Sequence, residues 1–170
     1  MSVRIQDFPG TPLREDDVRS GRVLTVSGAA RAEYAWDLGV AMTRYLEELR
    51  NGRLVGQRCR HCGRVLFPPR AFCEQCFCPT TEWVALPDTG VIQTFAICHI
   101  AWDAQRIDEP KLPAVIAVDG ASRNMGLLHL IGGVEPERVA VGQRVRAVWR
   151  PPDERQGAIT DILYFTPTEA

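Results

Sequence analysis

The chain has 170 residues, of which 45% are hydrophobic, so it can bury a core and form one domain or two small ones. Lys and Arg total 20 against 21 for Asp and Glu, which excludes a global field that would attract polyanions. The N-terminus lacks the features of a secretory signal, and no apolar run approaches the roughly 18 residues that cross a bilayer. These features predict a globular cytoplasmic protein without membrane association, in a compartment where thiols stay reduced.

The first predicted element is a helix over residues 33–50. Apolar residues recur there at three- and four-residue steps and therefore share one helical face: Tyr34, Leu38, Ala41, Met42, Tyr45, Leu46 and Leu49. Asn51 and Gly52 follow, and both tolerate the left-handed conformation that ends helices. Trp36 and Val40 lie off this stripe and form a smaller apolar patch. Either the N-terminal arm covers this patch or a partner docks on it.

Residues 59–76 read CRHCGRVLFPPRAFCEQC, which is two Cys-x-x-Cys pairs separated by ten residues. Two residues between thiolates let each pair wrap around one metal ion, and ten residues between the pairs let the chain return to the same ion. In a reducing compartment, this pattern favours a metal over disulfides. Four thiolates favour tetrahedral zinc, and they leave no open position for a catalytic water. The sequence therefore predicts structural zinc at Cys59, Cys62, Cys73 and Cys76.

The second Cys-x-x-Cys pair departs from the first at one position. Gly63 directly follows the first pair, where the turn favours a residue that accepts positive φ. Phe77 stands at the equivalent place after the second pair and is followed by a further cysteine, Cys78. This departure leaves Cys78 as an alternative to Cys76 for the fourth ligand.

The remainder of the chain predicts a small β-barrel. Five short apolar runs are separated by Gly, Pro and charged residues, at 91–100, 114–118, 125–131, 144–149 and 159–165. No helical pattern between them is long enough for parallel crossovers, so an OB-like barrel is the predicted fold, with a short helix or loop at 132–139.

The predicted fold class is thus mainly β with an N-terminal helix, in which a zinc ribbon precedes a five-stranded OB-fold barrel. The predicted divisions are an N-terminal arm and amphipathic helix at 1–52, the ribbon at 53–84 and the barrel at 85–170.

The histidines and the remaining cysteine do not form a catalytic pattern. His61 lies inside the first Cys-x-x-Cys pair, and His99 and His129 lie in predicted strands. Cys98 and His99 are neighbours in one strand and point to opposite faces, which places them poorly for a nucleophile and base pair. Motifs of serine hydrolases, phosphate-binding loops and zinc peptidases are absent from the sequence. This absence, with the spare apolar patch, predicts an accessory or binding subunit.

The sequence resembles the domain of unknown function 35 family. The resemblance rests on GRLVGQRCRHCGRVLFPPRAFCEQC followed by WVALPDTGVIQTFAI, and it covers about residues 34–166. It implies a rubredoxin-like zinc ribbon joined to an OB fold, in proteins that accompany thiolase-superfamily enzymes acting on CoA thioesters. Members of the family form complexes with thiolases, with acyltransferases that make carbon–carbon bonds, or with lipid-transfer-protein-like aldolases, and the resemblance implies that this thiolase-like partner carries the catalytic residues. Our chain would then be a non-catalytic zinc subunit in a hetero-oligomer, which stabilises the partner and helps to hold the acyl-CoA.

Contacts to CoA can be sketched from its chemistry, because phosphates and an adenine suit arginine and an aromatic plane. Arg70, Trp102 and Arg106 are the predicted contributors.

Two alternatives stay open at this point. The first is a single-stranded nucleic-acid binder, for which RVRAVWRPPDER at 144–155 is the candidate basic segment. The second is an iron redox protein that uses the same four cysteines, although the spacer between the pairs is usually longer in such proteins.

Overall fold

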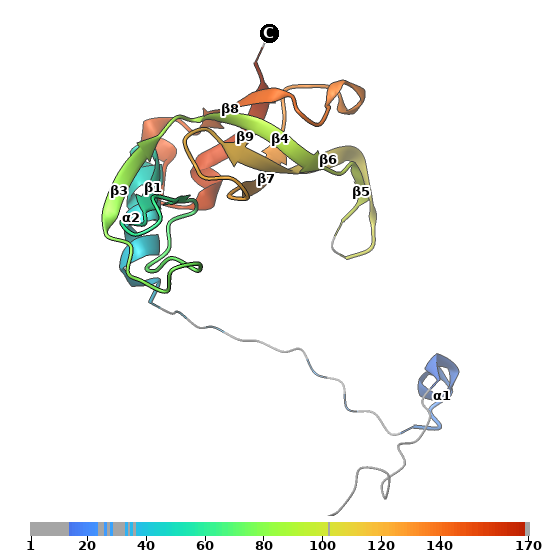
Figure 1. Ribbon diagram of the computed structural model, residues 1–170. Helices are drawn as coiled ribbons and strands as arrows, with labels where there is room; N and C mark the ends of the chain where they lie inside the picture. The colour runs from blue at the N-terminus through green and yellow to red at the C-terminus, as the bar shows by residue number, and fades with distance from the viewer. Residues whose placement is uncertain are drawn as a thin grey trace, which may run out of the picture. The chain divides into compact units, whose positions relative to one another are not determined.

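The computed structural model describes residues 14–23, 26, 28, 33, 35, 37–101 and 103–168, in two units. The first unit, residues 1–36, contains the short helix α1 (Glu15–Arg19). The second unit, residues 37–170, contains the long helix, the cysteine segment and the strands (Figure 1). Within the described ranges, none of the helices combines the length and apolarity that a membrane crossing requires.

The predicted helix is confirmed as α2 (Gly39–Arg50), but it begins at Gly39 rather than near residue 33. The carboxylate of Asp37 accepts a hydrogen bond from the Gly39 amide at 2.8 Å, and Gly39 has a φ of 69°. This local turn interrupts the right-handed helical path just before α2. The buried face carries Ala41, Tyr45 and Leu49 of the predicted stripe. Val40 is exposed, whereas Tyr34 and Trp36 lie outside the described residues.

The cysteine segment forms a small three-stranded antiparallel sheet. The central strand is β1 (Leu54–Arg58), flanked by β2 (Val65–Leu66) and β3 (Glu82–Leu86). Helix α2 packs on this sheet: the guanidinium of Arg44 lies 4.6 Å from the ring centroid of Trp83 on β3, and Tyr45 meets Phe67 edge to face.

The barrel prediction is also confirmed. The strands are β4 (Thr89–Phe95), β6 (Arg106–Val118), β7 (Leu127–Ile131), β8 (Arg144–Trp149) and β9 (Ile162–Pro167). They are paired in the closed order β4-β6-β7-β9-β8-β4, in which β7 and β9 run parallel. This is the topology of an OB fold. The predicted element at 132–139 contains the 3-10 turn η2 (Pro136–Arg138).

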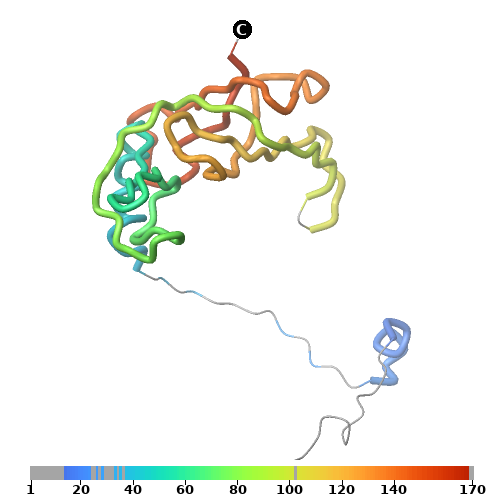
Figure 2. Tube along the Cα trace, viewed as in Figure 1, coloured from blue at the N-terminus to red at the C-terminus, as the bar shows by residue number. Residues whose placement is uncertain are grey.

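Four of the five predicted runs differ from the observed strands. β6 begins at Arg106 rather than at residue 114, and β7 begins at Leu127 rather than at residue 125. The run at 91–100 divides at Ala96 into β4 and β5 (Cys98–Ile100), and β5 pairs with the first half of β6. The resulting hairpin extends away from the barrel (Figure 2). The last strand begins at Ile162 instead of residue 159, because residues 159–161 form the 3-10 turn η4 (Ile159–Asp161). A third 3-10 turn, η3 (Pro152–Glu154), precedes it.

The ribbon and the barrel share one hydrophobic core. Buried residues form a continuous cluster that runs from Tyr45 on α2 through Leu66 on β2 to Ile116 and Phe165 in the barrel. Two hydrogen bonds tie β2 to the loop that follows β6: the Ser122 amide donates to the Val65 carbonyl at 3.0 Å, and the Val65 amide donates to the Ser122 hydroxyl at 2.9 Å. The cysteine segment is therefore fixed against the barrel by packing and by backbone hydrogen bonds.

Candidate metal centre and adjoining surfaces

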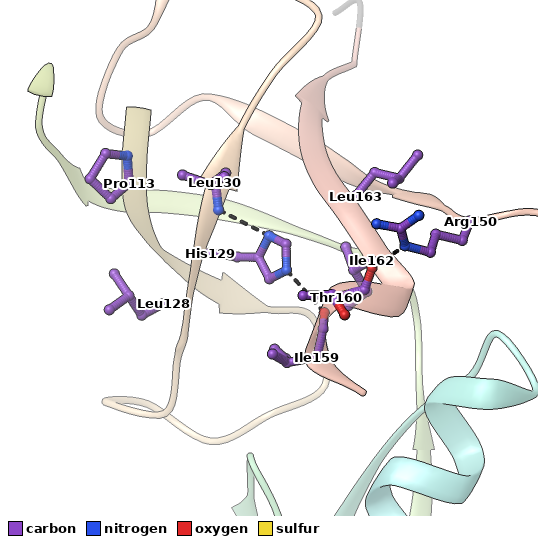
Figure 3. Close-up of a pocket in the computed structure, with 9 residues that line it drawn as sticks. All are labelled: Pro113, Leu128, His129, Leu130, Arg150, Ile159, Thr160, Ile162 and Leu163. Atoms are coloured by element: carbon purple, nitrogen blue, oxygen red, sulfur yellow. Dashed lines mark hydrogen bonds between the residues drawn. The ribbon is translucent and has the colours of Figure 1, made fainter. Parts of the chain in front are cut away.

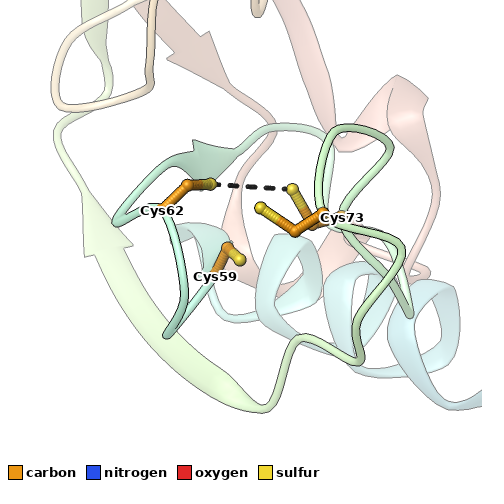
Figure 4. A group of neighbouring side chains, drawn as sticks. Cys59, Cys62 and Cys73 are labelled. Atoms are coloured by element: carbon orange, nitrogen blue, oxygen red, sulfur yellow. Dashed lines mark hydrogen bonds between the residues drawn. The ribbon is translucent and has the colours of Figure 1, made fainter.

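The four predicted ligands are brought together by the fold. The sulfur atoms of Cys59, Cys62, Cys73 and Cys76 all lie within 4.8 Å of one another. Cys59 and Cys73 are fully buried, and Cys62 lies on the exposed rim. Figure 4 shows the labelled cysteines converging from the turn after β1 and from the loop before β3.

The two Cys-x-x-Cys turns have the same backbone hydrogen bonds. In the first, the Gly63 amide donates to the Cys59 carbonyl at 2.9 Å, and the Cys59 amide donates to the Arg64 carbonyl at 2.8 Å. In the second, the Phe77 amide donates to the Cys73 carbonyl at 2.8 Å, and the Cys73 amide donates to the Cys78 carbonyl at 2.9 Å. Cys76 is thus the structural equivalent of Cys62. This supports Cys76 over Cys78 as the fourth ligand.

Phe77 takes the backbone conformation for which glycine is better suited. Its φ is 51°, against 73° for Gly63, and the residue is 83% exposed. Since a side chain costs about 1 kcal/mol in this conformation, we expect Gly63→Ala to lower the free energy of unfolding by about 1 kcal/mol. Phe77→Gly should leave the free energy of unfolding unchanged or raise it slightly. Glycine removes the strain of the positive φ, but its larger conformational entropy in the unfolded state offsets part of that gain. Urea unfolding of the zinc-loaded variants measures both; equal losses would contradict the equivalence of the two turns.

The cluster is electrostatically suited to a cation. Hydrogen bonds from the backbone amides of Cys62 and His61 lower the pKa of the Cys59 thiol to about 6, against the opposing effect of burial. Hydrogen bonding with Cys62 and burial raise the pKa of Cys76, and the neighbouring Cys59 raises that of Cys78. The thiolate of Cys59 is therefore favoured, whereas the thiolates of Cys76 and Cys78 are disfavoured until a metal ion neutralises the group.

The spacing of the sulfurs fits zinc. A zinc–sulfur bond of about 2.3 Å with tetrahedral angles places neighbouring sulfurs about 3.8 Å apart. The Cys62 and Cys73 sulfurs are 3.7 Å apart, which is close to one edge of such a tetrahedron. Four thiolates at these positions would hold zinc and supply folding energy.

The predicted CoA contacts are distributed over separate parts of the chain. Arg70 lies in the loop between the two cysteine pairs, where its guanidinium is 3.6 Å from the Glu74 carboxylate. Arg106 is exposed at the start of β6, opposite Ile100 of the protruding hairpin. Trp102 lies outside the described residues.

An apolar groove lies on the outer surface of the barrel between β7 and β9 (Figure 3). It has a volume of about 410 Å³, and its apolar lining residues are Pro113, Leu128, Leu130, Ile159, Ile162 and Leu163. The two strands are registered at a single pair, Ile131 with Phe165, and diverge beyond it. The His129 ring fills part of the gap, where its Nε2 lies 3.3 Å from the Ile159 carbonyl oxygen. No local sequence pattern indicates this groove, because its lining joins residues of β7 to residues of the turn η4 that lie about thirty positions away.

The candidate basic segment for nucleic acid is neutralised within the structure. Its four arginines contact acidic or aromatic partners: Arg144 with Asp119, Arg146 with Asp88, Arg150 with Glu154, and Arg155 with the Trp149 ring. A groove for single strands needs arginines and aromatic faces that are available to the ligand, so this arrangement disfavours the nucleic-acid interpretation.

The histidines and Cys98 do not assemble into an active site in the part of the chain that the structure describes. His61 and His99 are exposed, and His129 contacts the Ile159 carbonyl and the Phe165 ring. Hydrogen bonds between a cysteine thiol and a histidine ring are absent among residues 37–101 and 103–168.

Comparison with known proteins agrees with this architecture. The zinc-ribbon domain described as "ChsH2, rubredoxin-like zinc ribbon domain" matches residues 46–81, and "ChsH2, C-terminal OB-fold domain" matches residues 83–150. A DUF35 domain-containing scaffold protein of Methanocaldococcus jannaschii is 34% identical over 119 residues, which cover 68% of this chain and 82% of the relative. The chain belongs to the DUF35 family.

Two further similarities are to proteins with the names of enzymes. A probable enoyl-CoA hydratase alpha subunit of Thermomonospora curvata is 24% identical over 111 residues, which cover 64% of this chain but 33% of that protein. The solved structure of an Ltp2-ChsH2(DUF35) aldolase superposes with a TM-score of 0.53 and 21% identity, covering 73% of this chain and 91% of the other. At that identity the likeness concerns the fold. The zinc-ribbon and OB-fold resemblance of the sequence is thereby confirmed for this DUF35 protein.

Proposed function

We propose that this protein is a non-catalytic, zinc-binding accessory subunit that stabilises a thiolase-superfamily enzyme acting on acyl-CoA thioesters. The observation that carries the proposal is the combination of a four-cysteine cluster with no open ligand position and a described surface without a nucleophile and base pair. A zinc ion held by four thiolates organises structure but does not activate water. The chemistry of the complex would then belong to the partner.

The comparisons support an enzyme as the partner. The relative from Methanocaldococcus jannaschii is named a scaffold protein, the Ltp2-ChsH2 structure is named an aldolase, and the relative from Thermomonospora curvata is named a probable enoyl-CoA hydratase alpha subunit. The names of the scaffold protein and the aldolase support an accessory role beside an enzyme, and the name of the hydratase subunit supports a CoA ester as the substrate. The thiolase-like character of the partner is our proposal, based on the family resemblance of the sequence.

The groove between β7 and β9 is where we place the partner contact. Leu128 is 68% exposed, and Leu130 and Leu163 are also exposed beside it. Exposed leucines that line one continuous groove mark an interaction surface more strongly than single apolar residues scattered over the surface. Ile97, just before β5, and Ile100, on β5, are further exposed apolar residues on the protruding hairpin.

A role in CoA binding is proposed for Arg70, Trp102 and Arg106. Arg70 and Arg106 are both exposed and able to meet phosphates. Since the two belong to the ribbon and to the hairpin, a ligand that contacts both would cross from one to the other, and the partner would complete its site.

The test is affinity purification of this full chain from its native cytosol, with protein identification and metal analysis of the same sample. We expect a thiolase-like protein in stable association, one zinc per chain, and no acyl-transfer activity of the chain alone. Acyl-transfer activity of the isolated chain, or association with nucleic acid in place of an enzyme, would overturn the proposal.

The partner surface has its own test. We expect Leu128→Asp with Leu163→Asp to weaken the complex at least tenfold, since each desolvated apolar contact contributes about 1–2 kcal/mol. Val141→Asp is the matched control, because Val141 is 63% exposed but does not line the groove. Titration calorimetry with the purified partner measures the affinities. Equal affinities for the double variant and the control would place the contact elsewhere.

A further inference from the structure

A fifth cysteine lies against the metal centre. The Cys78 sulfur is 3.5 Å from that of Cys59, as near as the 3.7 Å that separates Cys62 from Cys73. Both distances are close to the roughly 3.8 Å edge of a tetrahedral zinc–thiolate site. Cys78 is nevertheless outside the group of four sulfurs that all lie within 4.8 Å of one another.

The backbone holds Cys78 at this place. Its carbonyl accepts the hydrogen bond from the Cys73 amide that closes the second turn. In the first turn, the equivalent position is Arg64, whose side chain points to Glu74 and provides no metal-binding atom. Cys78 packs half-buried against the shared core, while Phe77 between Cys76 and Cys78 is exposed. The sulfurs of Cys76 and Cys78 thus both face the cluster, and the exposed Phe77 lies between the two cysteines in the sequence.

We propose that Cys78 is a reserve zinc ligand, which takes the fourth position when Cys76 is lost or chemically blocked. When Cys76 is blocked, its bond to zinc would break; the Cys78 thiol would release its proton to solvent, and its sulfur would take the vacated position. The proposal rests on zinc occupancy of the centre. Its consequence is a subunit that keeps its metal and its fold after damage to Cys76.

The experiment compares the full chain with Cys76→Ser, Cys78→Ser and the double variant, and Cys98→Ser is the control because Cys98 lies on β5 outside the cluster. Zinc affinity is measured by competition with a chromophoric chelator. Cobalt(II) replaces zinc in a second sample, because its visible absorption distinguishes four thiolates from three. Alkylation with iodoacetamide followed by mass spectrometry then reports which thiols the metal protects.

We expect Cys78→Ser and Cys98→Ser to keep the affinity and the four-thiolate spectrum. Cys76→Ser should also keep a four-thiolate spectrum, and Cys78 should become protected from alkylation in that variant alone. The double variant should bind zinc about a hundredfold more weakly than Cys76→Ser, the loss expected for one thiolate. If the double variant does not fold, the spectrum and the alkylation pattern of Cys76→Ser still test whether Cys78 replaces Cys76 as a ligand.

Three results would overturn the proposal. A three-thiolate spectrum for Cys76→Ser would show that Cys78 does not replace it. A large loss of zinc affinity in Cys78→Ser would make Cys78 an ordinary ligand. A wild-type chain without zinc affinity would remove the metal centre itself, which is a separate failure from the first two.

Discussion

Zinc removal is expected to lower the thermal unfolding midpoint of the full chain by at least about 10 °C. Structural zinc contributes about 10–16 kcal/mol of binding free energy in zinc-finger peptides. Even about 5 kcal/mol of this, at 2–4 °C for each kcal/mol in a chain of this size, corresponds to 10–20 °C. Differential scanning calorimetry with and without a zinc chelator measures the shift.

The effect should extend beyond the ribbon to the barrel. Val65, Leu66 and Phe67, between the two cysteine pairs, are buried in the cluster that also contains the barrel residues. Cys59 and Cys73 are fully buried in the same cluster. Loss of the metal leaves their thiols unconstrained, and the packing that joins β2 to the barrel loses its support. We therefore expect one cooperative transition at the lower temperature rather than an unchanged barrel transition.

Two variants separate metal loss from general damage. Cys73→Ser should reproduce the chelator's effect and bind less than one zinc per chain. Cys98→Ser replaces a cysteine on β5, outside the group of four, and should match the wild type in both zinc content and midpoint. A zinc-free chain, verified by metal analysis, that unfolds at the wild-type temperature would refute the structural role of the metal.

Much of the architecture was predictable because its signals are local. The apolar spacing of α2 and the Cys-x-x-Cys pairs are periodic patterns within short segments, and turn residues separate the five strands. The features that could not be predicted depend on contacts between distant segments. Residues 159–161 read as part of a strand, yet they form η4, because Asp161 binds the amides of three preceding residues. The protruding hairpin likewise arises because β6 begins eight residues before its apolar run, in a segment whose charged and proline residues hide the strand.

The candidate site likewise has parts that the sequence predicts and parts that it does not. The four cysteines followed from spacing alone, and the structure brings their sulfurs together. Arg70 and Arg106 were chosen for their chemistry, and no local pattern indicates whether two arginines from different segments meet one ligand. The groove between β7 and β9 involves residues more than thirty positions apart and one turn that the sequence pattern does not indicate.

Asp161→Asn is expected to lower the free energy of unfolding by about 2–3 kcal/mol at neutral pH. The Asp161 side chain is 1% exposed, and its carboxylate accepts hydrogen bonds from the amides of Gln156, Gly157 and Ala158 at 2.9, 2.7 and 3.1 Å. Asparagine has the same shape but provides one acceptor oxygen and a donor group, so at least one of the three amides loses its partner. Hydrogen bonds to a charged acceptor contribute about 1.5–3 kcal/mol each, and an unpaired buried donor costs about 1–3 kcal/mol.

The pH dependence identifies the carboxylate as the cause. Burial alone would raise the pKa of Asp161, but the amides of Gln156, Ala158 and Gly157 outweigh burial and hold the pKa below the ordinary aspartate value. A lowered pKa in the folded state contributes stability above the unfolded pKa of about 3.9, and that stability is lost as the pH falls through the folded value. The difference between wild type and Asp161→Asn should therefore be constant from pH 6 to 8 and shrink below about pH 4.

Urea unfolding in excess zinc measures the difference in unfolding free energy between wild type and Asp161→Asn at neutral pH. At acid pH, the unfolding free energies are compared with that of a control variant in the same loop. Asp153→Asn is that control, because Asp153 is exposed on η3 and a surface substitution of this kind changes stability by less than about 0.5 kcal/mol.

The turn that Asp161 organises also supports Ile159 and Thr160 in the groove between β7 and β9 and packs near α2, where the Arg50 guanidinium donates to the Gln156 carbonyl at 2.8 Å. Asp161→Asn should thus also weaken binding of the partner under conditions in which the variant remains folded. If Asp161→Asn loses the expected stability but binds the partner with wild-type affinity, partner binding at the groove does not depend on this loop.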